Sequence, residues 1–343
     1  MVWHLKRSHW VIAFALLAAV LTGLAIAWFA RPVMERAAAM TESTEFDQAP
    51  VYIGLQPVPE PGLRPFAMAL QGSKLLVSYL GSDRIDEFSE KLEYLRTLHL
   101  LDKAPASITG LAVDGDRIFA ADFTSGDLLF ADYKTGKLLR AYGWHPGHTA
   151  RMKALGVTFY SNTLYVSDVA SRQMLAIGAQ DEPKLREEGE LITRFPNGRA
   201  AELELGYPTW TMVTADGRLL VSDAKSGEIK VFTCNGRSAY LFGKEGAALR
   251  TPMGIAMDTV VSPALIKEAK EKFDPSPSRI SDQGRIHVVD AAPAGVKVFD
   301  ALGKYVLSYG TELKQPNGIA IDQKRRLIFI SDTALHAIAV YKY

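Results

Sequence analysis

One sequence pattern recurs six times along this chain, and the repeat constrains the fold more than any other feature. The last copy runs from Gln315 to Asp322, turns, and continues as a second apolar segment, Leu327–Asp332. Short β segments repeating every 40 to 50 residues or so are typical of propeller blades. A propeller hides its strand edges by radial repetition, so the repeat predicts an all-β, six-bladed β-propeller with four-stranded blades. The six copies begin at Arg64, Ser107, Lys153, Tyr207, Thr251 and Gln315.

Each copy has a physical interpretation. Four copies carry Pro just before the first strand, where a missing backbone N–H costs nothing. Four keep Gly two residues later, as expected where backbones crowd near a narrow central channel; the exceptions are Ala67 and Trp210. Five of the six copies end the second strand with Asp, in three of them as Ser-Asp, and this Asp is expected to bond the backbone of its own turn. The first copy has Tyr79 in place of the Asp.

The pattern Pro-x-Gly-Ile-Ala-x-Asp, followed by an apolar strand ending in Ser-Asp and a strand ending in Val-Phe, resembles the NHL-repeat family of six-bladed propellers. The resemblance covers residues 64–341 and is closest to a membrane-anchored bacterial type. It implies the fold but no activity, because members of that family include protein-binding, RNA-binding, sugar-binding and enzymatic domains.

The last copy ends after its third strand, at Ala337–Tyr341, which would leave an unpaired edge in the ring. The segment Val51–Pro57 is apolar, aromatic and β-prone. We expect it to supply the missing outer strand of blade six and close the ring; the alternative is a plain N-terminal linker.

The segment Trp10–Phe29 contains twenty residues without a charge, enough to span a bilayer as one transmembrane helix. Residues 1–30 are therefore predicted to be a cytoplasmic leader and membrane anchor, residues 31–50 a juxtamembrane stem, and residues 51–343 the propeller. Basic residues flank both ends, so their count does not set the orientation. The short leader and large following domain favour a single-pass inner (plasma) membrane protein with its propeller on the extracytoplasmic, periplasmic side. The competing interpretation is a signal peptide cleaved after the small residues Ala25-Ile26-Ala27.

Composition excludes several functions. The net charge is +1, which gives no basic footprint for nucleic acid. Cys234 is the only cysteine, so there is no internal disulfide and no cysteine metal cluster. The sequence has no Gly-x-Ser-x-Gly elbow and no phosphate-binding glycine loop, so hydrolases of that type and nucleotidases lack support.

Two insertions interrupt the repeat. Residues 259–283 replace a short turn in blade five, and the spacing of their apolar residues predicts a helix over about 263–273. Gly178–Gly189 forms a long charged connection in blade three. Both emerge on the side opposite the usual ligand-binding face of such propellers. They are either solvated surface loops or a partner-docking face.

Resemblance to enzymatic propellers raises the question of a metal. Gluconolactonase- and paraoxonase-type propellers hold a divalent cation through carboxylates and Asn projecting from inner strands. The corresponding positions in this chain contain only one candidate ligand, Asn317, and the set is too apolar for a hydrolytic metal. The six positions are Phe66, Thr109, Leu155, Thr209, Met253 and Asn317.

Amidating-lyase propellers use a zinc ion held by His residues, and zinc catalysis needs three converging ligands. His145 and His148 lie in the loop between blades two and three, where a turn is the competing interpretation. His287 is predicted to be a packed strand residue. We therefore expect no metal, no cofactor and no catalytic residue.

The channel mouth instead offers aromatic and cationic side chains, which would suit a peptide, a glycan or an anionic group. If buried, Trp210 is only a plug that replaces the missing Gly. The function predicted is a membrane-tethered binding or scaffolding propeller with a protein, peptide or glycan partner; the alternative is a metal-assisted lactonase or lyase. The candidate binding residues are Arg64, Thr109, Lys153, Tyr207, Trp210, Asn317, His145 and His148.

Overall fold

The computed structural model describes residues 48–101, 105–143, 151–178, 191–195, 204–246, 248–258 and 284–343. The predictions for the leader, the transmembrane helix, residues 31–47 of the stem, the His145 and His148 loop, residues 179–189 and the 259–283 insertion lie outside these ranges. Within the described ranges, no helix has the length and apolar character needed to cross a bilayer. Ala49–Tyr343 forms one compact unit.

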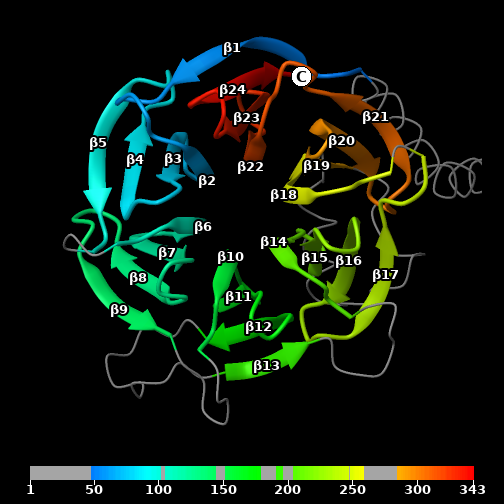
Figure 1. Ribbon diagram of the computed structural model, residues 1–343, viewed down its shortest axis with the longest axis horizontal. Helices are drawn as coiled ribbons and strands as arrows, with labels where there is room; N and C mark the ends of the chain where they lie inside the picture. The colour runs from blue at the N-terminus through cyan, green and yellow to red at the C-terminus, as the bar shows by residue number, and fades with distance from the viewer. Residues whose placement is uncertain are drawn as a thin grey trace, which may run out of the picture. The chain divides into compact units, whose positions relative to one another are not determined.

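This unit is a ring of six four-stranded antiparallel sheets around a central axis, viewed down that axis in Figure 1. The all-β, six-bladed prediction is therefore confirmed. Each blade begins with an inner strand at the axis and ends with an outer strand at the perimeter. Blades one to three comprise β2 (Pro65–Gln71), β3 (Lys74–Tyr79), β4 (Arg84–Phe88) and β5 (Tyr94–His99); β6 (Ile108–Asp114), β7 (Arg117–Asp122), β8 (Leu128–Asp132) and β9 (Leu138–Tyr142); and β10 (Ala154–Tyr160), β11 (Thr163–Asp168), β12 (Gln173–Gly178) and β13 (Leu191–Phe195). Blades four to six comprise β14 (Pro208–Val213), β15 (Arg218–Asp223), β16 (Glu228–Thr233) and β17 (Ser238–Phe242); β18 (Pro252–Asp258), β19 (Arg285–Ala291), β20 (Ala294–Asp300) and β21 (Tyr305–Tyr309); and β22 (Pro316–Asp322), β23 (Leu327–Asp332), β24 (Ala337–Lys342) and β1 (Val51–Pro57).

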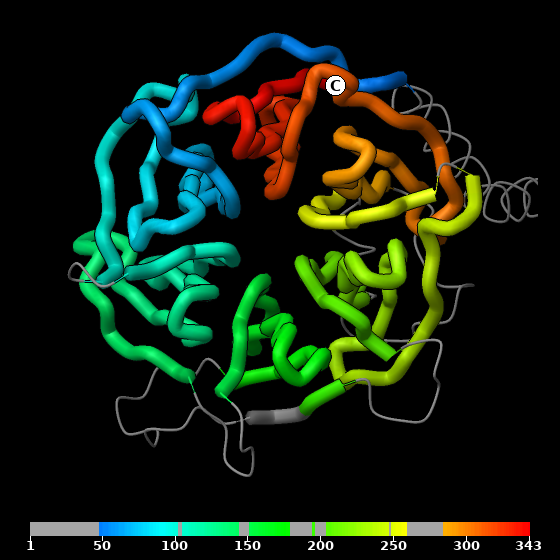
Figure 2. Tube along the Cα trace, in the orientation of Figure 1, coloured from blue at the N-terminus to red at the C-terminus, as the bar shows by residue number. Residues whose placement is uncertain are grey.

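The ring is closed by its first strand. β1 pairs antiparallel with β24, from Val51 opposite Lys342 to Pro57 opposite Ala337. The N-terminal strand thus becomes the outer strand of the last blade, as the tube in Figure 2 shows where blue meets red. Val51–Pro57 occupies the position that the sequence predicts for it, and β24 is left without an open edge.

The glycines of the inner strands sit where neighbouring blades meet. A Cβ added to Gly318 would lie 2.3 Å from the Phe66 carbonyl oxygen of the next blade, and one added to Gly254 would lie 2.6 Å from the Asn317 carbonyl oxygen. No side chain fits at such distances, so backbone crowding around the axis explains why these copies keep Gly.

A serine near the end of the second strand, just before the Asp or Tyr79, links neighbouring inner strands. Ser331 Oγ donates to the Phe66 carbonyl at 2.5 Å and accepts the Gly318 N–H at 2.8 Å, so one hydroxyl joins blade six to blade one. Ser222 Oγ likewise donates to the Met253 carbonyl at 2.6 Å. Four of the six junctions have such a serine, which is Ser78, Ser167, Ser222 or Ser331.

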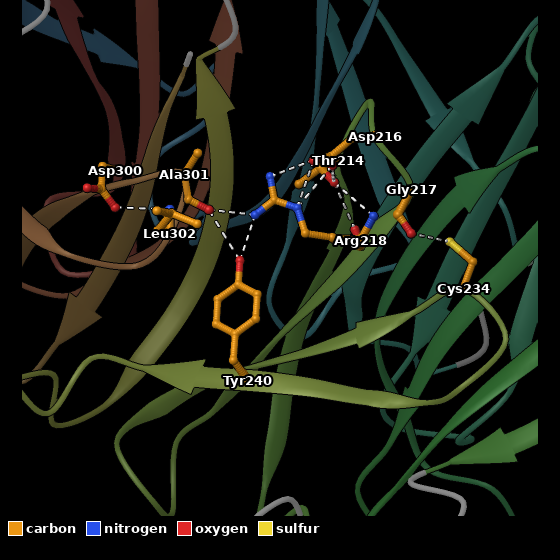
Figure 3. A network of polar contacts seen from close by, with 9 residues as sticks. All are labelled: Thr214, Asp216, Gly217, Arg218, Cys234, Tyr240, Asp300, Ala301 and Leu302. Atoms are coloured by element: carbon orange, nitrogen blue, oxygen red, sulfur yellow. Dashed lines mark hydrogen bonds and ion pairs between the residues drawn. The ribbon is translucent and has the colours of Figure 1, made fainter. Parts of the chain in front are cut away.

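A buried arginine ties blade four to blade five away from the axis (Figure 3). The Arg218 side chain is almost fully buried, and its guanidinium pairs with Asp216 at 2.9 Å. It also donates to the Tyr240 hydroxyl at 2.6 Å and to the Ala301 carbonyl at 2.5 Å. A buried charge is tolerated only when it is paired and hydrogen-bonded, and Arg218 meets this requirement with partners from both blades. These contacts hold blades four and five together.

Candidate functional site

Six equivalent backbone positions lie at the starts of the inner strands, where the sequence predicts the channel mouth. We call the residue just before each inner strand the rim residue of its blade. In all six blades, its carbonyl accepts a hydrogen bond from the N–H of the residue after the Asp near the end of the second strand, or after Tyr79 in blade one, at 2.8 to 3.1 Å. This repeated bond fixes the backbone of each rim residue. The rim residues are Arg64, Ser107, Lys153, Tyr207, Thr251 and Gln315.

The Asp that ends the second strand pins the same loop from behind. Asp332 accepts the N–H groups of Lys314 and Gln315, and also those of Ala334 and Leu335 in its own turn. The predicted bond to its own turn is thus present, and the bonds to the rim loop were not foreseen. Asp122, Asp168, Asp223 and Asp290 bond the rim loops of their blades in the same way.

Blade one departs from this arrangement. Its Tyr79 is fully buried and donates its hydroxyl to Asp86 at 2.7 Å, so it reaches along its own blade and not to the rim loop. The Arg64 backbone is therefore fixed only by its carbonyl, which accepts from the Leu80 N–H at 2.9 Å.

The buried carboxylates of blades four and five are further neutralised by lysines. Lys230 Nζ lies 3.0 Å from Asp223, and Lys297 Nζ lies 2.5 Å from Asp290. Burial alone would raise the pKa of Asp223, but the N–H groups of Gly206 and Tyr207 and the Lys230 ammonium hold that pKa below its ordinary value. The carboxylates therefore serve as fixed anchors of the rim.

Three of the candidate binding residues have exposed side chains on this pinned rim. Arg64 and Lys153 are exposed, and Tyr207 is 41% exposed. The Lys153 ammonium lies 4.3 Å from the centroid of the Phe123 ring, a cation–π distance that orients it above the second blade. Arg64, Lys153 and Tyr207 thus combine accessible polar groups with a backbone held in place.

The channel is closed just below the rim by aromatic packing across the axis. Phe66 comes from blade one and Trp210 from blade four, which lie opposite each other in a ring of six. Their ring centroids are 6.1 Å apart, and both side chains are buried in one apolar cluster that also contains Leu111. The partly buried Met253 of blade five packs against the same cluster. Trp210 is therefore a plug, one of the two interpretations that the sequence left open.

Two further candidate binding residues, Asn317 and Thr109, are buried, as is Thr209 on β14. Asn317 is 6% exposed, and its amide donates to the Gln315 carbonyl at 2.8 Å and to Thr333 Oγ1 at 3.2 Å. Thr209 is equally enclosed, and its hydroxyl donates to the Pro252 carbonyl at 2.8 Å. Thr109 is also buried, and its hydroxyl has no hydrogen-bond partner. The Asn317 and Thr209 hydrogen bonds therefore stabilise the floor, and none of the three side chains is exposed at the mouth.

Two further cationic side chains, which the repeat alone did not single out, lie next to the rim residues. Arg250 and Lys314 are exposed and stand one residue before the rim residues of blades five and six. Two positions precede each of the six inner strands, which makes twelve positions in all. Four of the twelve are cationic, namely Arg64, Lys153, Arg250 and Lys314, and none is a carboxylate. Starting each repeat one residue earlier in the sequence would have included Arg250 and Lys314 among the candidate binding residues.

No group of three His, Cys, Asp or Glu side chains suited to a metal ion occurs among the described residues. His287 is buried, as the sequence predicts, and its Nδ1 lies 3.0 Å from the Tyr309 hydroxyl. Burial, with a smaller contribution from the Arg285 charge, lowers the pKa of His287 to about 3, so this ring is neutral. His145 and His148 lie outside the described residues.

Comparison with known proteins supports the fold alone. No protein-family model matches the chain, and no curated protein matches it. Among solved structures it is similar to a catalytically inactive variant of virginiamycin B lyase from Staphylococcus aureus with quinupristin, at TM-score 0.56 and 12% identity, covering 84% of this chain and 98% of that one. A streptogramin B lyase matches at TM-score 0.55 and 14% identity, covering 86% and 88%. A chain of a mitotic checkpoint complex matches at TM-score 0.53 and 11% identity, covering 83% and 76%.

Proposed function

We propose that this protein is a membrane-tethered propeller of the NHL type that binds a protein, peptide or glycan partner at the mouth of its channel. In this proposal, Trp10–Phe29 anchors the chain in the inner membrane and the propeller lies on the extracytoplasmic side. The propeller performs no catalysis of its own.

The pinned rim is the observation that carries the proposal. Backbone bonds fix the loops in all six blades, so side chains such as Arg64, Lys153 and Tyr207 are presented with little freedom left to lose on binding. Arg and Tyr are also among the residue types enriched at the energetically dominant positions of protein interfaces. The plug of Phe66 and Trp210 directly beneath leaves a closed apolar floor, which suits surface recognition.

The experiment is affinity capture with the full-length chain in detergent, followed by binding measurements on the captured partner. Arg64→Ala, Lys153→Ala and Tyr207→Ala, separately and combined, are compared with Leu139→Ala, an exposed apolar residue on the perimeter strand β9. We expect the rim variants to lose at least tenfold in affinity, and Leu139→Ala to bind like the unaltered chain. Unchanged affinity in the triple variant, with its melting temperature preserved, would rule out the mouth.

The second candidate is a metal-assisted enzyme, and the specific observation in its favour is that two of the similar folds are named as lyases. Such an enzyme needs several converging nitrogen or oxygen ligands. Elemental analysis of the purified chain separates the candidates. One tightly bound zinc or calcium per chain, with turnover of a lactone or ester lost on chelation, would favour the enzyme.

A further inference from the structure

The strand that closes the ring also has the most concentrated exposed apolar surface of the described residues. Val51 is 65% exposed, Tyr52 41%, Ile53 55% and Leu55 45%, all on β1. Nine large hydrophobic residues among the described residues are at least 41% exposed, and β1 alone holds four of them within five positions. Isolated exposed hydrophobics are ordinary, but a contiguous group marks an interaction surface. The four on β1 lie on both sides of the outermost strand of blade six, and we call these four residues the β1 face.

The backbone of β1 is poorly suited to pairing with another strand. The register with β24 shifts between Tyr52 and Gly54, so Ile53 is a bulged residue without a partner. Pro50 and Pro57 bracket the strand. Bulges and prolines are the devices by which edge strands avoid sheet-to-sheet association. Strand addition by a second copy is therefore disfavoured, and whatever covers the β1 face has to do so through its side chains.

The position of β1 along the chain and its chemistry point to a lipid surface. Only residues 30–50 separate the apolar segment Trp10–Phe29 from Val51, so β1 is the described strand closest in sequence to that segment. Tyr52 is a residue type that favours the headgroup region of bilayers. Lys342, directly opposite Val51 in the register and exposed, adds a cation for anionic headgroups.

We propose that the β1 face rests on the bilayer that holds the Trp10–Phe29 segment, with Val51, Ile53 and Leu55 entering the headgroup region. This inference rests on the membrane tether of the proposed function. The closing strand would then have two roles, since it completes the ring and also sets the orientation of the propeller on the membrane. An oriented propeller presents its rim in a fixed direction to a partner.

The test uses the full chain, reconstituted in vesicles of phosphatidylcholine and phosphatidylglycerol at three to one, with a spin label at a single cysteine. Cys234→Ser removes the native thiol, and Ile53→Cys places the label on the β1 face. Leu139→Cys is the matched control, because Leu139 is 61% exposed on the perimeter strand β9 of blade two. Electron paramagnetic resonance then measures collisions with oxygen, which concentrates in lipid, and with an aqueous nickel complex.

We expect the ratio of oxygen to nickel collisions to be severalfold higher at position 53 than at position 139. Equal ratios at the two positions would overturn the proposal. Dipolar broadening at position 53 that disappears on dilution with unlabelled protein would also overturn it, because a second copy would then cover the β1 face. Flotation of the vesicles after an alkaline wash reports the tether separately. Loss of the protein from the floated vesicles would overturn both the tether and the lipid contact, whereas retention with equal collision ratios would overturn the lipid contact alone.

Discussion

Thr211 places a hydroxyl inside the packing between blades, where the other five inner strands carry apolar residues. It is 3% exposed and its Oγ1 has no hydrogen-bond partner. Burying an unpaired hydroxyl costs about 1–3 kcal/mol. We therefore expect Thr211→Val, which keeps the shape, to raise the free energy of unfolding by about 1 kcal/mol in urea denaturation. The five equivalent residues are Met68, Leu111, Val157, Ile255 and Ile319.

Thr209→Val is the matched control for that substitution, two residues away on the same strand. The Thr209 hydroxyl donates to the Pro252 carbonyl of the next blade at 2.8 Å, so its removal should destabilise the ring. The two substitutions have the same chemistry and opposite expected signs. A loss of stability in both would show that the Thr211 hydroxyl is satisfied in solution.

Asp258 provides a pH-dependent prediction at the same scale. It is 2% exposed, and burial raises the pKa of its carboxyl to about 6, although the Tyr343 hydroxyl and nearby arginines oppose the shift. Because the pKa is higher in the folded state than in the unfolded state, the protonated carboxyl favours folding. Its contribution is fully present below about pH 4 and is lost as the pH rises through about 6.

Asp258→Asn should therefore leave the melting temperature near pH 4 almost unchanged and raise it at pH 8. The measurement is thermal unfolding followed by circular dichroism across that pH range, for the variant and the unaltered chain. Parallel pH profiles for the two proteins would show that Asp258 does not carry this dependence.

At the scale of strands, the serine links make a sharper prediction than the hydrophobic contacts around them. Ser331→Ala removes the bond to the Phe66 carbonyl and leaves the Gly318 N–H without its acceptor, in a junction that excludes water. We expect a loss of about 1–3 kcal/mol in the free energy of unfolding. Ser308→Ala on β21 is the control, because Ser308 is exposed and such changes stay within about 0.5 kcal/mol. Equal effects from the two changes would mean that the link is not a source of stability.

The same junctions show how far sequence reasoning reaches. A repeated Gly predicts crowding at the axis because only a residue without Cβ tolerates it, and the distances at Gly254 and Gly318 agree. The serine link was not foreseen, because its acceptor is a carbonyl of the next blade and no local pattern reveals it. Pairing between opposite blades is similarly hidden, so the contact of Phe66 with Trp210 emerged only from the three-dimensional ring.

At the scale of the whole molecule, the repeat predicted the architecture because each blade is a local unit and the ring is their sum. The sequence predicted the candidate site less completely than the fold. Sequence placed eight residues at the mouth, and the structure presents Arg64, Lys153 and Tyr207 on its surface while enclosing Thr109, Trp210 and Asn317 in the floor. Burial at the axis depends on which side chains meet from opposite blades, and repeats aligned in one dimension do not encode that.

Closure is the property that belongs to the ring alone, and it yields the last prediction. Removing residues 1–48 leaves β1 intact, whereas removing residues 1–58 also deletes it and exposes the whole edge of β24. The longer deletion also loses the edge-to-face contact of Tyr52 with Tyr341, whose ring centroids are 5.6 Å apart. We expect the shorter chain to unfold cooperatively, and the longer one to melt at a clearly lower temperature and to aggregate through its open edge. Calorimetry and light scattering on the two chains check this. Coincident melting curves would show that the last blade holds with three strands, and that β1 is not what keeps the ring shut.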